Sequence, residues 1–214
     1  MKVPHGCSER RAVTFGKPGR PPEDRLARQR AIYERVAPLV LDRGPRAMSM
    51  RDAAQAAHMS VGGLYHYFPT KRDLVLHGLR PEAFARLCED FDAQWQSRRR
   101  SEPQACLSAF VEHFVTQVVF VRPSLHAALE LGTDTFWDTV DAGITAGLDD
   151  FSQFLQSVVL AVDDRDVAVL ARSLRRVFFA ALLDKSAGPD ALRGEVWALI
   201  EPFAPACQRG LGRS

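Results

Sequence analysis

Residues 48–74, MSMRDAAQAAHMSVGGLYHYFPTKRDL, determine how the N-terminal part of this chain folds. Ser49 and Asp52, three residues apart, form a capping-box pattern that predicts the start of a short, alanine-rich helix. A tight turn, His58–Ser60, leads to a second short helix that ends before Pro69. Two short helices joined by such a turn indicate a helix-turn-helix, whose second helix enters the major groove of DNA.

The second of these helices contains two adjacent glycines, Gly62 and Gly63. Glycine costs about 1 kcal/mol relative to alanine in a helix interior, which is a large penalty for so short an element. The penalty is understandable if the backbone must approach another molecule closely, as the wall of a DNA groove requires. The alternative, a loop that binds nothing, leaves the aromatic run after the glycines unexplained.

Apolar residues recur at helical spacing along nearly the whole chain, and no stretch alternates with the period of a strand for long. The chain is therefore predicted to be all-α. Gly44 followed by Pro45 predicts the end of a first helix over residues 23–43, which Pro38 should bend. Later prolines indicate helix starts. Further helices are expected near residues 81–99, 103–121, 124–131, 135–160, 164–184 and 190–208.

Charge is distributed unevenly along the chain, although the net charge is only +2. Residues 1–80 carry 15 Lys and Arg against 7 Asp and Glu, whereas the remaining residues carry 13 against 19. This pattern suits a protein whose basic N-terminal part neutralises phosphates and whose acidic remainder does not contact the nucleic acid.

With LYHYF followed by Lys71, the same stretch resembles the signature of TetR-type repressors. The resemblance covers about residues 25–80 at motif level, and the helical remainder matches that family only in length and class. It implies a homodimer of nine-helix subunits whose first three helices bind an operator in double-stranded DNA. The remaining helices would form a pocket for a small-molecule effector and the dimer interface.

The resemblance also implies DNA contacts at particular positions. The positions that would face the bases are Ser60, Val61, Gly62 and Tyr65, and those that would contact phosphates are Ser49, Tyr67 and Lys71. Gly63 lies in the same segment, and His66 can donate to a base or phosphate oxygen. Val61 can read DNA only by apolar contact, as with a thymine methyl group.

Two further features concern the fold of this motif. Leu64 and Phe68 are expected to anchor it in the core. Members of the family usually carry glycine where this chain has His58. Histidine tolerates a positive φ better than most other residues, so the turn is expected to survive.

Three parts are expected along the chain. They are a flexible basic arm (1–22), the helix-turn-helix domain (23–69) and a helical effector-binding and dimerisation domain (70–214). Thr70 and Asp73 predict the start of a helix that bridges the two domains. Within the arm, Gly19-Arg20-Pro21 resembles the core of an AT-hook, in which Arg20 would lie in the minor groove. A plain disordered tail is an equally good interpretation.

The helical domain is rich in Phe and Trp, which can line a cavity for an apolar or aromatic small molecule. Candidates to line such a site are Phe91, Trp95, Phe110, Phe114, Phe136, Trp137 and Phe151, and His113 and Gln117 could orient a ligand. Most of these aromatic residues must nevertheless belong to an ordinary core, and each polar residue taken alone is expected at the surface.

Two apolar stripes near the C-terminus suggest a dimer interface. Their members are Leu170, Leu174, Phe178 and Ala181 in one helix and Val196, Leu199 and Phe203 in the next. Both stripes exceed what one buried face needs, so the two helices could form a four-helix bundle with their symmetry mates. Burial within the subunit could account for one of the stripes.

Several other classes of protein lack support in the sequence. There is no HExxH, P-loop, nucleophile elbow or paired His/Glu spacing, so an enzyme is not expected. The four cysteines are far apart and show no CxxC spacing, so no metal site, disulfide framework or cofactor is expected. No apolar run approaches the ~20 residues of a membrane span, and a cytoplasmic location is expected. A regulator or activator without an effector remains the alternative to an effector-released repressor.

Overall fold

The computed structural model describes residues 24–99, 101–132 and 163–204, and all regular structure in these ranges is helical. The all-α prediction is confirmed. The elements are α1 (Arg25–Ala47), α2 (Met50–Ala56), α3 (Val61–Tyr67), α4 (Lys71–Val75), η1 (His77–Leu79), α5 (Pro81–Trp95), α6 (Pro103–Leu131), α8 (Asp164–Leu183), α9 (Pro189–Ile200) and η2 (Glu201–Phe203).

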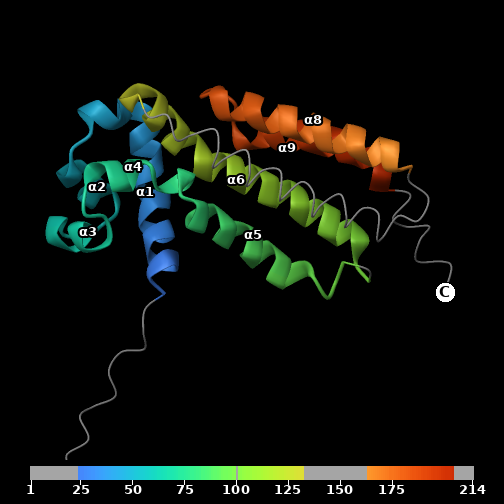
Figure 1. The fold of residues 1–214 in the computed structure, drawn as a ribbon, viewed down its shortest axis with the longest axis horizontal. Helices are drawn as coiled ribbons and strands as arrows, with labels where there is room; N and C mark the ends of the chain where they lie inside the picture. Colours follow the sequence, from blue (N-terminus) through green and yellow to red (C-terminus); the bar gives the residue numbers. More distant parts are fainter. Residues whose placement is uncertain (1–23, 100, 133–162, 205–214) are drawn as a thin grey trace, which may run out of the picture.

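α6 is the central helix of the described structure. Figure 1 shows α5 along one side of it, α8 and α9 along the other, and α1 to α4 gathered at one end. We call α1 to α4 the head and the remaining helices the body. α1 packs directly against α6, and one continuous hydrophobic core runs through head and body.

The helix starts follow the local sequence signals. Both predicted capping boxes are present, Ser49 with Asp52 at α2 and Thr70 with Asp73 at α4. α5, α6 and α9 each begin with proline at the first helical position, where the missing N–H costs nothing. α5 and α9 end earlier than expected, at Trp95 and Ile200.

Two internal prolines, Pro38 and Pro123, lie within helices. α1 continues through Pro38 and departs from helical geometry only at Gly44 (φ 76°, ψ 158°), where the predicted stop lies. The predicted break at Pro123 is wrong, because α6 runs unbroken to Leu131. A proline inside a helix costs about 3 kcal/mol, and Pro123 is buried where α6 packs against α1, α8 and α9, so tertiary packing outweighs that cost.

The composition of α6 reflects its central position. It is the one helix in the described ranges that is long and apolar enough to cross a membrane, with a mean hydropathy of 1.3 over its most apolar window. The expectation that no apolar run approaches that length is therefore corrected. The same window is 56% buried inside the protein. Packing against helices on both sides accounts for its apolar character.

Buried polar groups connect α6 to the end of α8. Arg122 donates from Nε to the carbonyl of Ala181 over 2.9 Å and from Nη1 to that of Ala187 over 2.8 Å. His126 Nε2 lies 3.0 Å from the Leu182 carbonyl oxygen. Burial lowers the pKa of Arg122, and the nearby Asp184 carboxylate opposes that shift. Carbonyls at the C-terminus of a helix lack intrahelical partners, so these contacts fix α8 on α6.

Candidate nucleic-acid interface

α2 and α3 are joined by a turn that needs an unusual backbone conformation. The Ala57 N–H closes α2 on the Ala53 carbonyl, and His58 then adopts a φ of 55°. The positive φ expected at this histidine is confirmed. Ser60 begins α3, and its hydroxyl accepts a hydrogen bond from the Gly63 N–H over 3.0 Å. These local bonds set the direction in which α3 leaves the turn.

α3 has one face in the core and one face toward solvent. Leu64 and Phe68 are completely buried, so their predicted role as anchors is confirmed. On the opposite face the side chains of Val61 and Tyr65 are 36% and 46% exposed, and His66 is exposed as well. Val61 and Tyr65 are four residues apart and therefore share this exposed face, which is available to contact another molecule.

The two glycines of α3 have different surroundings. A Cβ atom on Gly63 would lie 3.1 Å from Ser60 Oγ, so the helix cap itself favours glycine there. A Cβ atom on Gly62 would meet nothing within 4 Å. No contact within the described structure therefore explains Gly62, and its lack of a side chain leaves the exposed backbone open to a partner.

α1 holds the C-terminal end of α3. Arg25 Nη2 donates to the His66 carbonyl over 2.9 Å, and Gln29 Nε2 donates to the Tyr67 carbonyl over 2.8 Å. The Arg25 guanidinium also lies over the Tyr67 ring, 5.9 Å from its centre. Sequence reasoning missed both α1 residues. The signal was weak, because a basic and an amide residue four apart occur on many exposed helix faces.

Comparison with known families identifies this arrangement. Residues 37–77, from the middle of α1 to η1, match the family described as bacterial regulatory proteins, tetR family. Residues 37–77 therefore form a DNA-binding domain of the TetR type. The region that decides the assignment is the helix-turn-helix just described.

Individual proteins agree with the TetR assignment. The HTH-type transcriptional repressor KstR2 of Mycobacterium tuberculosis is 32% identical over 100 residues, which are 45% of this chain and 50% of that protein. The chain thus spans about half the length of the curated relatives it matches. A transcriptional regulator (TerR/AcrR family) from Aquifex aeolicus VF5 has a TM-score of 0.54 at 16% identity, covering 82% of this chain and 98% of that one. The TetR-family regulator PfmR from Thermus thermophilus has a TM-score of 0.52 at 22% identity, covering 85% and 99%. The two structures establish a shared fold.

Two of the predicted phosphate positions, Ser49 and Lys71, have side chains at the start of α2 and are partly engaged within the protein. The Ser49 hydroxyl donates to the Asp52 carboxylate over 2.6 Å, and the Ser49 backbone N–H donates to the same carboxylate. These two hydrogen bonds lower the pKa of the Asp52 carboxyl. Lys71 Nζ lies 3.0 Å from the Met48 carbonyl oxygen, which it uses as an acceptor. An ammonium group has three N–H donors, so Lys71 keeps capacity for a phosphate beside the start of α2.

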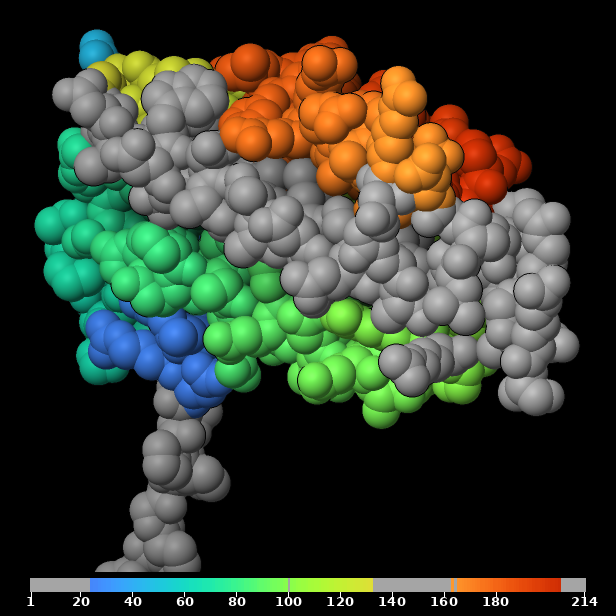
Figure 2. All heavy atoms as spheres, turned by 45° about the vertical axis from the view of Figure 1, so that its right-hand side comes forward, coloured from blue at the N-terminus to red at the C-terminus, as the bar shows by residue number. Residues whose placement is uncertain are grey.

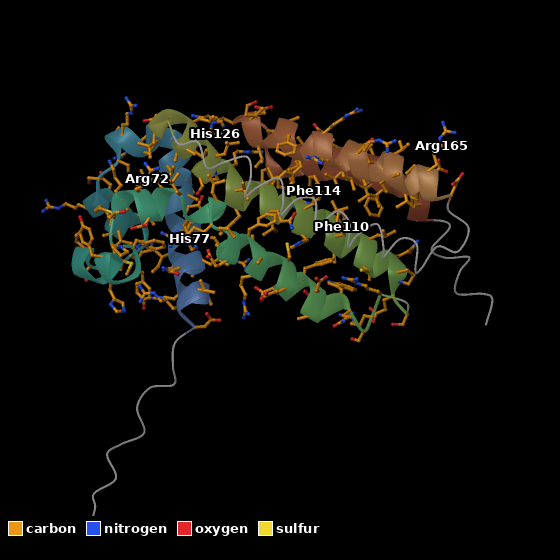
Figure 3. All side chains as sticks on the ribbon, viewed as in Figure 1. Arg72, His77, Phe110, Phe114, His126 and Arg165 are labelled. Atoms are coloured by element: carbon orange, nitrogen blue, oxygen red, sulfur yellow. The ribbon has the colours of Figure 1, made fainter. Side chains whose placement is uncertain are left out.

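The predicted effector residues within the described ranges fall into two groups. Trp95, Phe110 and Phe114 are buried side chains of the core, 6%, 6% and 2% exposed. Figure 3 shows Phe110 and Phe114 on α6, away from the head. The other group is polar at its centre: the Phe91 ring stacks on His113 at 4.5 Å, and Gln117 Nε2 lies 2.8 Å from His113 Nε2.

Other predicted residues lie elsewhere. Arg20, Phe136, Trp137 and Phe151 are outside the described residues. The structure corrects most of the predicted dimer stripes, because their side chains fill the core of one subunit. The buried members are Leu170, Leu174, Phe178, Ala181 and Val196, each 5% exposed or less. Leu199 and Phe203 are half-buried at the edge of that core.

Proposed function

We propose that this chain is a one-component transcriptional repressor that binds a palindromic operator as a homodimer and is released by a small apolar or aromatic effector. The observation that carries the proposal is the outward face of α3. There Val61, Gly62, Tyr65 and His66 are exposed on a helix whose other face is fixed in the core. The likeness to a protein named as a transcriptional repressor supports the direction of regulation.

The chemistry of the α3 face fits the major groove. Tyr65 and His66 offer groups that donate to base edges or phosphates, and Val61 offers methyl groups to a thymine methyl. Gly62 allows the helix backbone to approach the groove. Ser49, Tyr67 and Lys71 would contact phosphates and set the position of α3, and Arg20 would reach the adjacent minor groove.

The head also lies where a two-fold dimer can present it. Figure 2 shows the head (blue to teal) at one end of the molecule, with α9 (red) extending toward the other end. We place the dimer contact on the outward faces of α8 and α9. This is supported by the exposed apolar side chains of Val169 and Leu183, 46% and 55% exposed, and by the half-buried Leu199 and Phe203.

The effector would bind among the helices of the body. Phe91 and His113 present stacked rings there, and Gln117 supplies a hydrogen-bonding group beside them. Rigid aromatic side chains with a small number of polar groups are typical of sites for ring-containing ligands. A ligand changes operator affinity only to the extent that it binds one head position more tightly than another.

The operator proposal is tested by selecting bound DNA from a random pool with the full-length protein. The expected result is a site with two-fold symmetry, whose half-sites are roughly 34–36 Å apart, centre to centre. Selected sites without such symmetry would contradict the dimer model. Deleting residues 1–20 should weaken binding most at sites flanked by A·T tracts, because the narrow minor groove there attracts arginine.

The effector proposal is tested by screening aromatic and fatty-acid-like compounds for a thermal shift. Each compound that stabilises the protein is then added to an operator-binding measurement, where weaker binding is expected. If none of them changes operator affinity, a regulator without an effector becomes the better description.

A further inference from the structure

The head meets the body at a buried joint formed by α1, η1 and α6. Tyr33 Oη lies 3.0 Å from the Phe120 carbonyl oxygen and 2.7 Å from Ser124 Oγ, and the Gly78 N–H donates to Ser124 Oγ over 2.9 Å. One proton arrangement uses every group: Tyr33 donates to Phe120, Ser124 to Tyr33, and Gly78 to Ser124. The network is therefore complete without a further member.

η1 is pressed tightly against α6 at this joint. A Cβ atom on Gly78 would lie 2.5 Å from the Phe120 carbonyl oxygen and 2.9 Å from Tyr33 Oη. Real Cβ atoms do not come so close to a backbone oxygen, so only glycine fits. The segment that links head to body is thus held by direct backbone contact.

His77 lies in the same joint but outside its hydrogen-bond network. It is 1% exposed, and its ring meets those of Tyr33, Phe68 and Phe120 edge-on at 5.4, 5.3 and 6.0 Å. Neither Nδ1 nor Nε2 has a hydrogen-bond partner in the part of the chain that the structure describes. Burial, with a smaller effect of the Arg80 charge, lowers the pKa of His77 to about 4, so the ring is neutral.

The position of His77 connects the end of α3 to the body. Phe68 ends α3, Phe120 belongs to α6, and the His77 ring touches both. Figure 3 shows His77 where the head meets α6. A buried polar group without a partner destabilises the arrangement that buries it. A phenylalanine would provide the same ring contacts without that penalty.

We propose that His77 keeps the joint between head and body easy to open. Its two unpaired nitrogens raise the free energy of the closed joint, and a shift of the head that lets the imidazole reach water removes that cost. The joint is thereby poised between two head positions. A regulatory role for this joint rests on the proposed function, in which an effector moves the head.

The first test compares the full-length protein with His77→Phe in the absence of DNA. The variant should raise the Tm by roughly 2–8 °C, as expected when a buried unpaired polar group is removed from a chain of this size. Amides of η1 should exchange with deuterium about tenfold more slowly. His113→Phe is the control, because it removes a half-buried histidine that does have a partner, and its Tm should fall or stay unchanged. His77→Leu provides a second variant with the same expectation.

The second test measures head position directly. Dyes are placed at Arg51 on α2 and Arg165 on α8, both exposed, in a variant whose Cys7 and Cys207 are replaced by serine. The distribution of energy-transfer distances should be narrower in His77→Phe than in the parent. The inference would be overturned if the distance distributions of His77→Phe and the parent were equal. It would also be overturned if both His77 variants had a lower Tm than the parent, or if both left the exchange of the η1 amides unchanged. Since no DNA is present, failure of operator binding would count against the proposed function alone.

Discussion

α3 in the head and α6 in the body use their polar side chains in opposite ways. On α3, Tyr65 and His66 point to solvent beside an open glycine. On α6, Arg122 donates to two carbonyls at and just beyond the end of α8, so its donors are used within the protein. Binding capacity that a protein leaves free on an ordered surface is available to a partner. This difference supports our proposal that the nucleic-acid contact lies on α3.

The largest expected effect is on the free energy of unfolding, which should respond differently to substitution of two neighbouring residues of α3. Leu64→Ala should reduce the free energy of unfolding by about 2–5 kcal/mol, because Leu64 is completely buried. Tyr65→Ala should change it by only about 0.5 kcal/mol, since nearly half of that side chain is exposed. Chemical denaturation measures both, and operator binding should be lost in both variants. A stable Tyr65→Ala protein with full affinity would remove α3 from the interface.

His77, which is buried, and His113, which is half-buried, should make stability depend on pH. Burial lowers the pKa of both His77 and His113 to about 4, so each is neutral in the folded protein and takes up a proton on unfolding below pH 6.5. Stability should therefore fall as the pH decreases from 6.5 to 4, with His77 contributing about 3 kcal/mol at pH 4. Denaturation curves of His77→Phe across this range should show a shallower decline than the parent. An identical decline would mean that His77 is not buried as described.

A smaller contrast is expected between a phosphate contact and a base contact. Lys71→Ala should weaken binding to all DNA sequences alike and reduce the slope of log affinity against log salt by about 1. Val61→Ala should cost about 1 kcal/mol at one base pair of the operator and leave other positions unchanged. Binding titrations on single-base operator variants at two salt concentrations distinguish the two. A sequence-selective loss in Lys71→Ala would reverse these roles.

Much of the head could be predicted from the sequence because its signals are local. Ser49, Ser60 and Thr70 each cap a helix within three residues, and the turn at His58 depends on one backbone angle. Leu64 and Phe68 could be assigned to the core from helical spacing alone. The contacts of Arg25 and Gln29 could not be predicted, since they join residues about 40 positions apart.

The body was harder to predict because tertiary packing outweighs its local signals. Pro123 normally interrupts a helix, yet α6 continues through it between packed neighbours. The sequence predicts a dimer contact for the apolar stripes of α8 and α9, but the structure places Leu174 and Val196 in the subunit core. Periodicity shows which face of a helix is apolar but not what covers that face. His77 carried no sequence signal, because its importance comes from three rings brought together by folding.

The most direct test of the account is the effect of Gly62→Ala on stability and on operator affinity together. A Cβ at this position meets nothing within 4 Å, so the variant should fold and gain about 0.5–1 kcal/mol of stability from better helix propensity. Gly194→Ala in α9, which also has open space, is the matched control for helix propensity and should gain similar stability. We expect Gly62→Ala to bind the selected operator at least about tenfold more weakly, a loss of about 1.4 kcal/mol. A Gly62→Ala protein that is more stable and keeps full affinity would contradict the claim that α3 contacts DNA through its open backbone.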